Sequence, residues 1–145
     1  MDMKRIAIGA IVGAITLYVT GLLSDMVLAD FYAANTSAAG RAVFKEPALG
    51  LALRLANLAM AALVTLAVIL RRDTSIAAGA MTGGVVGFLA GANVSAAFYG
   101  FTIIWSLTGH LVFPVDQAVH TAIAGAAIAA VLSRVPGSAA VQAAR

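Results

Sequence analysis

Four apolar stretches of this chain are each long enough to cross a lipid bilayer, and this restricts the fold more than any other feature. A membrane-spanning helix needs about 20 mainly apolar residues. The sequence offers such stretches at residues 6–30, 47–70, 75–99 and 115–133. Because hydrocarbon cannot hydrogen-bond an exposed backbone, each stretch is expected to be an α-helix. We therefore predict one all-α transmembrane domain over residues 1–145, a four-helix bundle.

The composition excludes a soluble globular domain. Only 10% of the 145 residues are charged, whereas soluble domains carry about 25%. The absence of cysteine excludes disulfides, thiolate catalysis and cysteine-ligated metal clusters. A net charge of +3 is also found in nucleic-acid-binding proteins, but here the basic residues are scattered at the ends of the apolar stretches. Membrane topology explains that distribution better, so no nucleic-acid partner is expected.

The basic residues also predict an orientation. Six of them fall on one side of a four-pass bundle: Lys4, Arg5, Arg71, Arg72, Arg134 and Arg145. The opposite loops hold two basic residues, Arg41 and Lys45, offset by Asp30 and Glu46, and then only His110 and Asp116. The positive-inside rule then places both termini in the cytoplasm. The first stretch is longer than a signal-peptide core of about 7–15 residues, so we expect a true span. The Ala-rich composition suggests a bacterial inner-membrane protein.

The connection at residues 100–113 is unusually apolar for an external loop. Two interpretations remain open, an interfacial segment or a short re-entrant helix. In either case an aromatic belt is expected at the outer interface, formed by Trp105, Tyr99, Phe98 and Tyr32.

An internal repeat links the first and third stretches. Gly9-Ala10, followed by Gly13, reappears seventy residues later as Gly79-Ala80, followed by Gly83. Because each unit would be a two-helix hairpin, the two units would share one orientation. The pattern therefore predicts a parallel repeat, related by an axis along the membrane normal.

Glycines four residues apart line one face of two helices. The residues concerned are Gly9, Gly13 and Gly21 in the first stretch, and Gly79, Gly83, Gly87 and Gly91 in the third. A face without side chains lets another backbone approach closely, which is how membrane helices associate. The sequence predicts tight packing but does not decide whether the partner helix belongs to this chain or to another copy.

A few polar side chains interrupt the apolar stretches at similar depth. They are Asp25, Arg54, Asn57, Asn93 and His120. Helix rise puts Asp25, Arg54, Asn93 and His120 about 7–10 Å inside the outer ends of their spans, and Asn57 shares a helix face with Arg54. Since an unpaired charge in hydrocarbon costs at least ~2.5 kcal/mol, Arg54 is expected to pair with Asp25. The layer is then either an interhelical clamp or a polar pocket for a proton, ion, lipid headgroup or small ligand.

No chemistry of a catalytic or metal site is recognisable. His110 and His120 are ten residues apart, which matches neither haem nor zinc spacing. Asp25 and His120 would supply acid–base chemistry only if they converge. We predict no cofactor, no metal and no catalytic residue, and an enzyme is the less favoured interpretation.

Three short motifs occur along the chain: Gly9-Ala10-Ile-Val-Gly13, Asp30-Phe31-Tyr32, and Phe98-Tyr99-Gly100-Phe101-Thr102 before Trp105. With these motifs the chain resembles a group of small bacterial four-helix membrane proteins of unknown function. The resemblance implies fold and location only. The leading hypothesis is a structural or accessory protein of the bilayer, oligomeric through its glycine faces. The alternative is a small transporter or ligand-binding protein that uses the polar layer.

Overall fold

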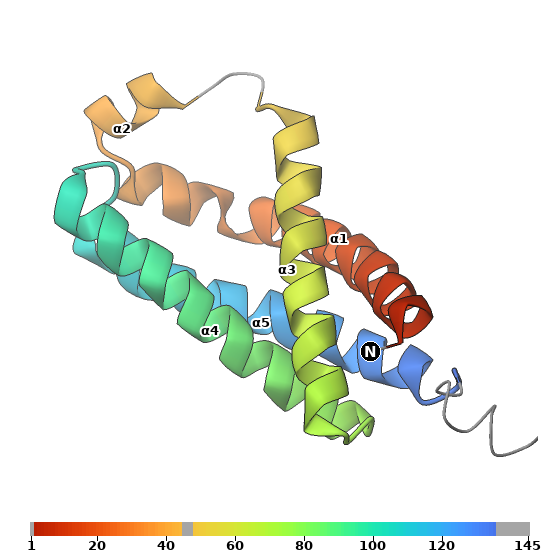
Figure 1. Cartoon of the computed structure of the whole chain (residues 1–145). Coiled ribbons are helices and arrows are strands. Elements are labelled where there is room, and N and C mark those ends of the chain that lie inside the picture. The colour runs from red at the N-terminus through yellow and green to blue at the C-terminus, as the bar shows by residue number, and fades with distance from the viewer. Residues whose placement is uncertain (1, 45–47, 136–145) are drawn as a thin grey trace, which may run out of the picture.

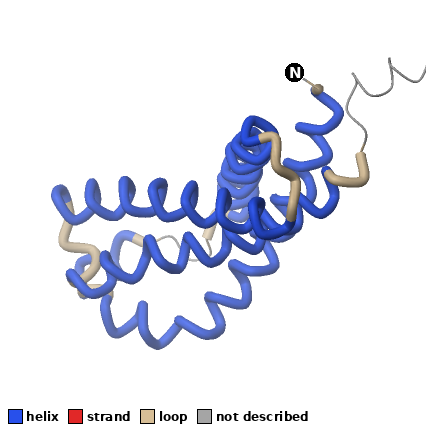
Figure 2. The backbone as a smooth tube through the Cα atoms, turned by 90° about the horizontal axis from the view of Figure 1, so that it is seen from below, coloured by secondary structure: helices blue, strands red, loops and turns tan. Residues whose placement is uncertain are grey.

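A computed structural model describes residues 2–44 and 48–135 of the chain. Its helices are α1 (Met3–Asn35), α2 (Ala38–Val43), α3 (Gly50–Arg71), α4 (Ile76–Phe101) and α5 (Leu107–Leu132). Four of them are long and apolar enough to cross a membrane. Within the described residues no strand is present, and short loops join the helices at their ends (Figure 2). The predicted all-α bundle of four apolar helices is confirmed.

The helix ends follow local capping rules. Asp2 accepts the amide hydrogen of Lys4 at 3.1 Å and begins α1. Ser75 caps α4 through the amide of Ala78. The Ser75 amide donates in turn to Asp73 at 2.9 Å, and this hydrogen bond holds the pKa of the Asp73 carboxyl below its usual value. The predicted span at 47–70 starts at Pro47, which lies outside the described residues, as do Lys45, Glu46 and Arg145.

The helices α4 and α5 form a hairpin in which the two backbones touch. Gly79, Gly83, Gly87 and Gly91 are all buried on the α5 side of α4. A Cβ atom at Gly83 would overlap the carbonyl oxygen of Thr121 in α5. Because only glycine leaves room for this approach, the glycine face of α4 is occupied by a helix of the same chain.

The segment at 100–113 differs from its predicted form. Only a short bend follows α4. The Ser106 hydroxyl then accepts the Gly109 amide hydrogen and caps the start of α5, which runs without a break through Pro114. Proline cannot donate a hydrogen bond to the residue four positions back, His110. The hydroxyl of Ser95 in α4 donates to that carbonyl at 2.6 Å instead. A neighbouring helix thus satisfies the freed carbonyl, so residues 107–113 belong to the fourth long helix rather than to a separate re-entrant piece.

The tightest packing lies at one end of the bundle. Val64, Val68 and Ile128 are fully buried there, and Gly9 and Gly13 of α1 lie against Thr65 and Ala61 of α3. Residues 50–56 of α3, by contrast, are all exposed. Figure 1 shows why: α3 crosses the other long helices at a steep angle, and its first turns leave the bundle. The four helices therefore enclose a core at one end and are open at the other.

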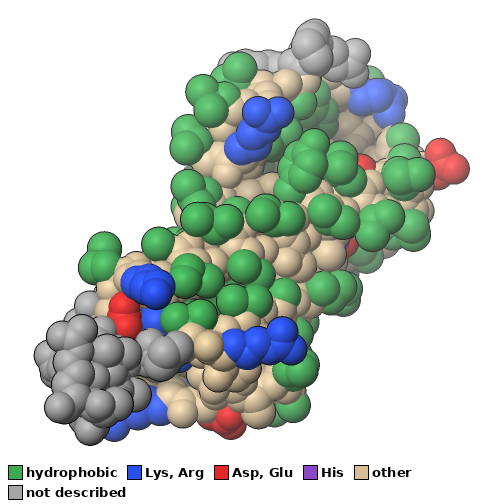
Figure 3. Space-filling model, turned by 90° about the vertical axis from the view of Figure 1, so that its right-hand side faces the viewer, with side chains coloured by type: hydrophobic (Ala, Val, Ile, Leu, Met, Phe, Trp, Pro, Cys, Tyr) green, Lys and Arg blue, Asp and Glu red, His purple; other side chains and the backbone are tan. Residues whose placement is uncertain are grey.

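The surface fits a bilayer. Hydrophobic side chains cover the middle of the face in Figure 3, while charged ones gather towards its ends. Arg5, at the start of α1, donates to the carbonyl of Leu132 at the end of α5 with a distance of 3.3 Å. The turn between α3 and α4, with Arg71 and Arg72, lies at the same end of the bundle (Figure 1). The described basic residues of the predicted inner side thus gather at one end.

The α4–α5 contact predicts different outcomes for two adjacent glycines. In Gly83→Ala the new methyl group meets the backbone of α5, so we expect a loss of about 1–3 kcal/mol in the free energy of unfolding. In Gly84→Ala the nearest atom to the methyl group is the Ala122 Cβ at 3.5 Å, an ordinary contact, and stability should hold. Unfolding by sodium dodecyl sulfate in mixed micelles measures both. Equal stability of the two variants would contradict the packing.

The Ser95–His110 bond predicts coupling between two substitutions. Ser95→Ala leaves the His110 carbonyl without its donor and should cost about 1–2 kcal/mol. In the Pro114→Ala background, residue 114 regains an amide hydrogen that can bond to that carbonyl. The same Ser95→Ala change should then cost about 1 kcal/mol less, which a double-mutant cycle measures. Additive effects would show that the hydroxyl does not compensate for the proline.

Candidate functional site

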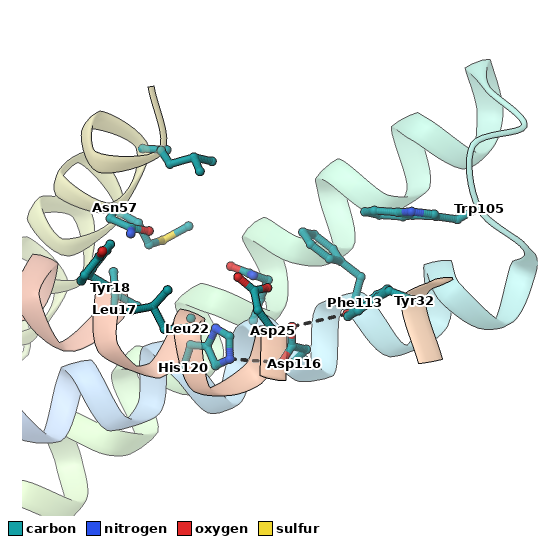
Figure 4. A pocket seen from close by; sticks show the side chains of 15 residues that line it. Leu17, Tyr18, Leu22, Asp25, Tyr32, Asn57, Trp105, Phe113, Asp116 and His120 are labelled. Carbon is teal, nitrogen blue, oxygen red and sulfur yellow. Dashed lines mark hydrogen bonds and ion pairs between the residues drawn. The ribbon is translucent and has the colours of Figure 1, made fainter. Parts of the chain in front are cut away.

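A cavity of about 520 Å³ lies between α1, α3 and α5, where α3 leaves the bundle. Its polar and aromatic lining comes from three helices and the α4–α5 loop: Tyr18, Asp25, Tyr32, Asn57, Trp105, Phe113, Asp116, Gln117 and His120. In Figure 4 the side chains of Asp25, Asp116 and His120 lie around one part of the cavity. Trp105, Phe113 and Tyr32 lie on one side of them, and Asn57 and Tyr18 on the other.

The loop that carries Trp105 is fixed to the end of α1. The Ser37 amide donates to the Ile104 carbonyl, and the Ser106 amide donates to the Asn35 carbonyl, each at 2.8 Å. Gly40 of α2 lies so close to the Ile104 backbone that a Cβ atom would have no room. These bonds hold the Trp105 ring beside Tyr32, with ring centroids 5.9 Å apart, and beside Phe113, at 5.4 Å. The aromatic side of the cavity is therefore braced rather than free.

Asp116 is the centre of the polar network in the cavity. Its carboxylate lies 3.1 Å from Nε2 of His120, one helical turn further along α5. It accepts a hydrogen bond from the hydroxyl of Ser24 at 2.7 Å and a longer one from Tyr32 at 3.4 Å. The Asp116 and His120 side chains are only 13% and 12% exposed. Three polar partners from two helices thus offset the cost of placing this carboxylate in an apolar bundle.

Only part of the predicted polar layer converges. Asp25, Asn57 and His120 line the cavity together. Arg54 lies in a neighbouring hollow with Tyr18 and Asn57, and within the described residues the expected ion pair with Asp25 does not form. Equal depth did not bring these two together, because the first turns of α3 diverge from α1.

Asn93 is also outside the cavity. It is exposed on α4, two residues from Gly91 and Ser95, both of which are buried. Successive helical residues turn by about 100°, so Asn93 points away from the face that meets α5. Helix rise predicts only a depth along the helix, whereas the direction of the side chain depends on which face packs.

Gly21 lines the cavity instead of packing against a helix. Gly9 and Gly13 meet Thr65 and Ala61, and the same antiparallel register would bring Gly21 opposite Leu53. A Cβ atom at Gly21 would meet nothing within 4 Å. The glycine face of α1 is therefore used for packing at the closed end and borders open space where α3 has moved away.

His110 forms a separate buried polar site. It is 4% exposed, and its Nδ1 lies 3.1 Å from the Ser95 hydroxyl oxygen. Since that hydroxyl donates its single hydrogen to the His110 carbonyl, Nδ1 carries a proton and donates to Ser95. The Nε2 atom, enclosed near the Tyr99 and Trp105 rings, has no hydrogen-bond partner in the described part of the chain. His110 was placed in an external loop by the sequence, so this position is a correction.

The geometry of the cavity does not place a hydroxyl group for nucleophilic catalysis. The Ser24 hydroxyl donates to a carboxylate, not to the imidazole of His120, so the imidazole is not placed to take the hydroxyl proton. Within residues 2–44 and 48–135, no group of three or more His, Cys, Asp or Glu side chains could hold a metal ion. Two carboxylates beside an imidazole can face a cation.

Sequence reasoning missed Asp116, Gln117 and Ser24. Asp116 lies at the edge of the predicted span 115–133 and was grouped with the charges of the outer loop. The signal was nevertheless present, since Asp116 and His120 are four residues apart and share a helix face. Because α5 begins at Leu107, Asp116 lies well inside the helix rather than at its end.

Comparisons with protein-family models, with curated proteins and with solved structures find no match to this chain. The cavity is therefore interpreted from its own geometry.

The Asp116 network predicts an interhelical contribution from Ser24. Ser24→Ala removes a 2.7 Å hydrogen bond to an ionised group and should cost about 1.5–3 kcal/mol in the free energy of unfolding. Thr20, one turn earlier, bonds only to carbonyls of its own helix. Thr20→Ala should therefore change stability by less than about 0.5 kcal/mol, measured in the same detergent titration. A smaller loss in Ser24→Ala than in Thr20→Ala would contradict the network.

Proposed function

We propose that this chain is a small multi-pass membrane protein that binds a small ligand in the cavity between α1, α3 and α5. The observation that carries the proposal is the convergence of Asp25, Asp116 and His120, from two helices, on one open cavity. Polar groups inside a membrane are costly and tend to mark substrate, ion or proton pathways. Here they face a space large enough for a ligand, and ligand pockets usually measure about 300–1,000 Å³.

The polar groups of the cavity support ligand binding more than a purely structural clamp between helices. A clamp requires its polar groups to satisfy one another. Asp116 meets that condition, but Asp25 makes no hydrogen bond or ion pair in the part of the chain that the structure describes. A carboxylate without a protein partner at the edge of a cavity is available to a ligand.

The proposal places the cavity on the outer flank of a bacterial inner membrane. Lys4, Arg5, Arg71, Arg72 and Arg134 belong to the opposite, closed end of the bundle. By the positive-inside rule that end faces the cytoplasm, as do both termini. The resemblance to small bacterial four-helix membrane proteins and the duplication of the two hairpins remain predictions consistent with this placement.

Oligomerisation through the glycine faces is the weaker second hypothesis. The α4 glycines are already covered by α5, and Gly9 and Gly13 are covered by α3. These faces therefore offer no free surface to a second copy. A structural role would have to use other, lipid-facing residues.

The cavity predicts water access at a depth where lipid-facing residues have none. The chain has no cysteine, so single-cysteine variants can be labelled without background. Gly21→Cys lies on the cavity lining, and we expect its thiol to react at least roughly tenfold faster with a water-soluble methanethiosulfonate than a lipid-facing thiol does. The matched position is Val19, two residues away on α1 and 48% exposed on the surface.

The protein is reconstituted in proteoliposomes and the reagent is added outside. The increase in protein mass on labelling measures the rate of reaction. Fast reaction of Gly21→Cys and slow reaction of Val19→Cys support the proposal. Equally slow reaction at both positions would mean that the cavity is closed or filled with lipid, and the proposed function would then be wrong.

A further inference from the structure

The charges that line the cavity have one sign. Asp25 and Asp116 are its carboxylates, His120 is its one imidazole, and no Lys or Arg side chain is among the lining residues. Arg54, the basic residue of the predicted polar layer, lines a neighbouring hollow that shares Tyr18 and Asn57 with the cavity. Because Coulomb interactions are stronger in a low-dielectric surrounding than in water, this lining favours a positive ligand and opposes an anion.

The two carboxylates differ in what they have left to offer. Asp116 is already bonded to Ser24, Tyr32 and His120. Asp25, on α1, has no such bonds within the described residues and faces the same part of the cavity (Figure 4). Asp25 is therefore the carboxylate that would pair directly with a ligand, while the Asp116 network shapes the wall beside it.

Aromatic rings complete the lining next to these acids. Trp105, Phe113 and Tyr32 form a contiguous group, with the Trp105 ring centroid 5.4 Å from that of Phe113 and 5.9 Å from that of Tyr32. Aromatic faces attract cations within about 6 Å, and they bind quaternary ammonium groups well. A hydrated metal ion would gain little from such a wall, whereas an organic cation with an apolar body would contact both rings and acid.

We propose that the cavity binds a small organic monocation, an amine or quaternary ammonium ion with an apolar body. The inference rests on the proposed function, since it names the ligand class of the same cavity. Asp25 would pair with the positive charge, and Trp105 with its neighbours would cover the apolar part. At about 520 Å³ the cavity suits a ligand of roughly one aromatic ring with substituents.

Trp105 is the single tryptophan of the chain, so its fluorescence reports directly on the cavity. The probe is benzyltrimethylammonium, titrated into the full-length protein in nanodiscs with excitation of tryptophan. We expect a saturable change in fluorescence. Its neutral carbon isostere, in which carbon replaces the ammonium nitrogen, and the anion benzenesulfonate should bind at least roughly tenfold more weakly.

Two variants separate binding at Asp25 from adsorption to an acidic surface. Asp25→Asn should raise the dissociation constant of the cation roughly tenfold. Asp30→Asn removes an equally negative, exposed residue of α1 that does not line the cavity, and it should leave the constant unchanged. The cation should also protect Gly21→Cys from the thiol reagent, a second readout that does not depend on Asp25 variants folding.

Failure of this inference can be told apart from failure of the proposed function. If Gly21→Cys reacts rapidly with the thiol reagent but the cation neither protects it nor changes Trp105 fluorescence, the ligand class is wrong and the open cavity stands. Equal affinity for the neutral isostere, or an unchanged constant in Asp25→Asn, also overturns the inference. If Gly21→Cys does not react at all, both proposals fail.

Discussion

The close approach of α4 and α5 is the contact on which the rest of this structure depends. Four glycines of α4 remove every side chain from one face, and α5 lies directly against that backbone. The contact fixes the rotation of α5, because Thr121 and Gly125 must face α4. Asp116 and His120 then lie on a different face and meet α1 and the cavity. A packing rule for membrane helices thus determines where the polar chemistry is placed.

The bundle treats its polar groups differently in the α4–α5 contact and beside α3. Where α5 packs against α4, the Ser95 hydroxyl donates to the His110 carbonyl that Pro114 leaves free. Where α3 diverges, Asp25 and Asn57 face open space instead. Unpaired polar groups are costly in a bilayer, and their position beside a cavity supports the proposal that water or a ligand occupies it. The opening of the bundle is therefore the feature that turns a structural fold into a candidate binding protein.

The sequence predicted the helices better than it predicted their directions. Hydropathy and length were sufficient for four long helices, since a bilayer permits little else. Depth grouped Asp25 with His120, and these two residues line one cavity together with Asn57. It failed for Asn93, whose direction is set by the glycine face beside it, and for Arg54, which sits on a diverging helix end. Neither the crossing of α3 nor the continuation of α5 through Pro114 follows from one-dimensional periodicity, because both depend on tertiary contacts.

The central claim is that α3 touches α1 at one end of the bundle and stands away from it at the other. Disulfide formation between introduced cysteines measures this directly, because two residues cannot be bridged unless their Cβ atoms come within about 3.5–4.5 Å. A Cβ at Gly13 would lie 3.0 Å from that of Ala61, so only a small outward shift separates this pair from disulfide geometry, and we predict that Gly13→Cys/Ala61→Cys is readily oxidised. Gly21→Cys/Leu53→Cys continues the same register, but nothing lies within 4 Å of a Cβ at Gly21, and this pair should stay reduced. Efficient oxidation of the second pair would show that the two helices pack along their whole length and that the cavity between them does not exist.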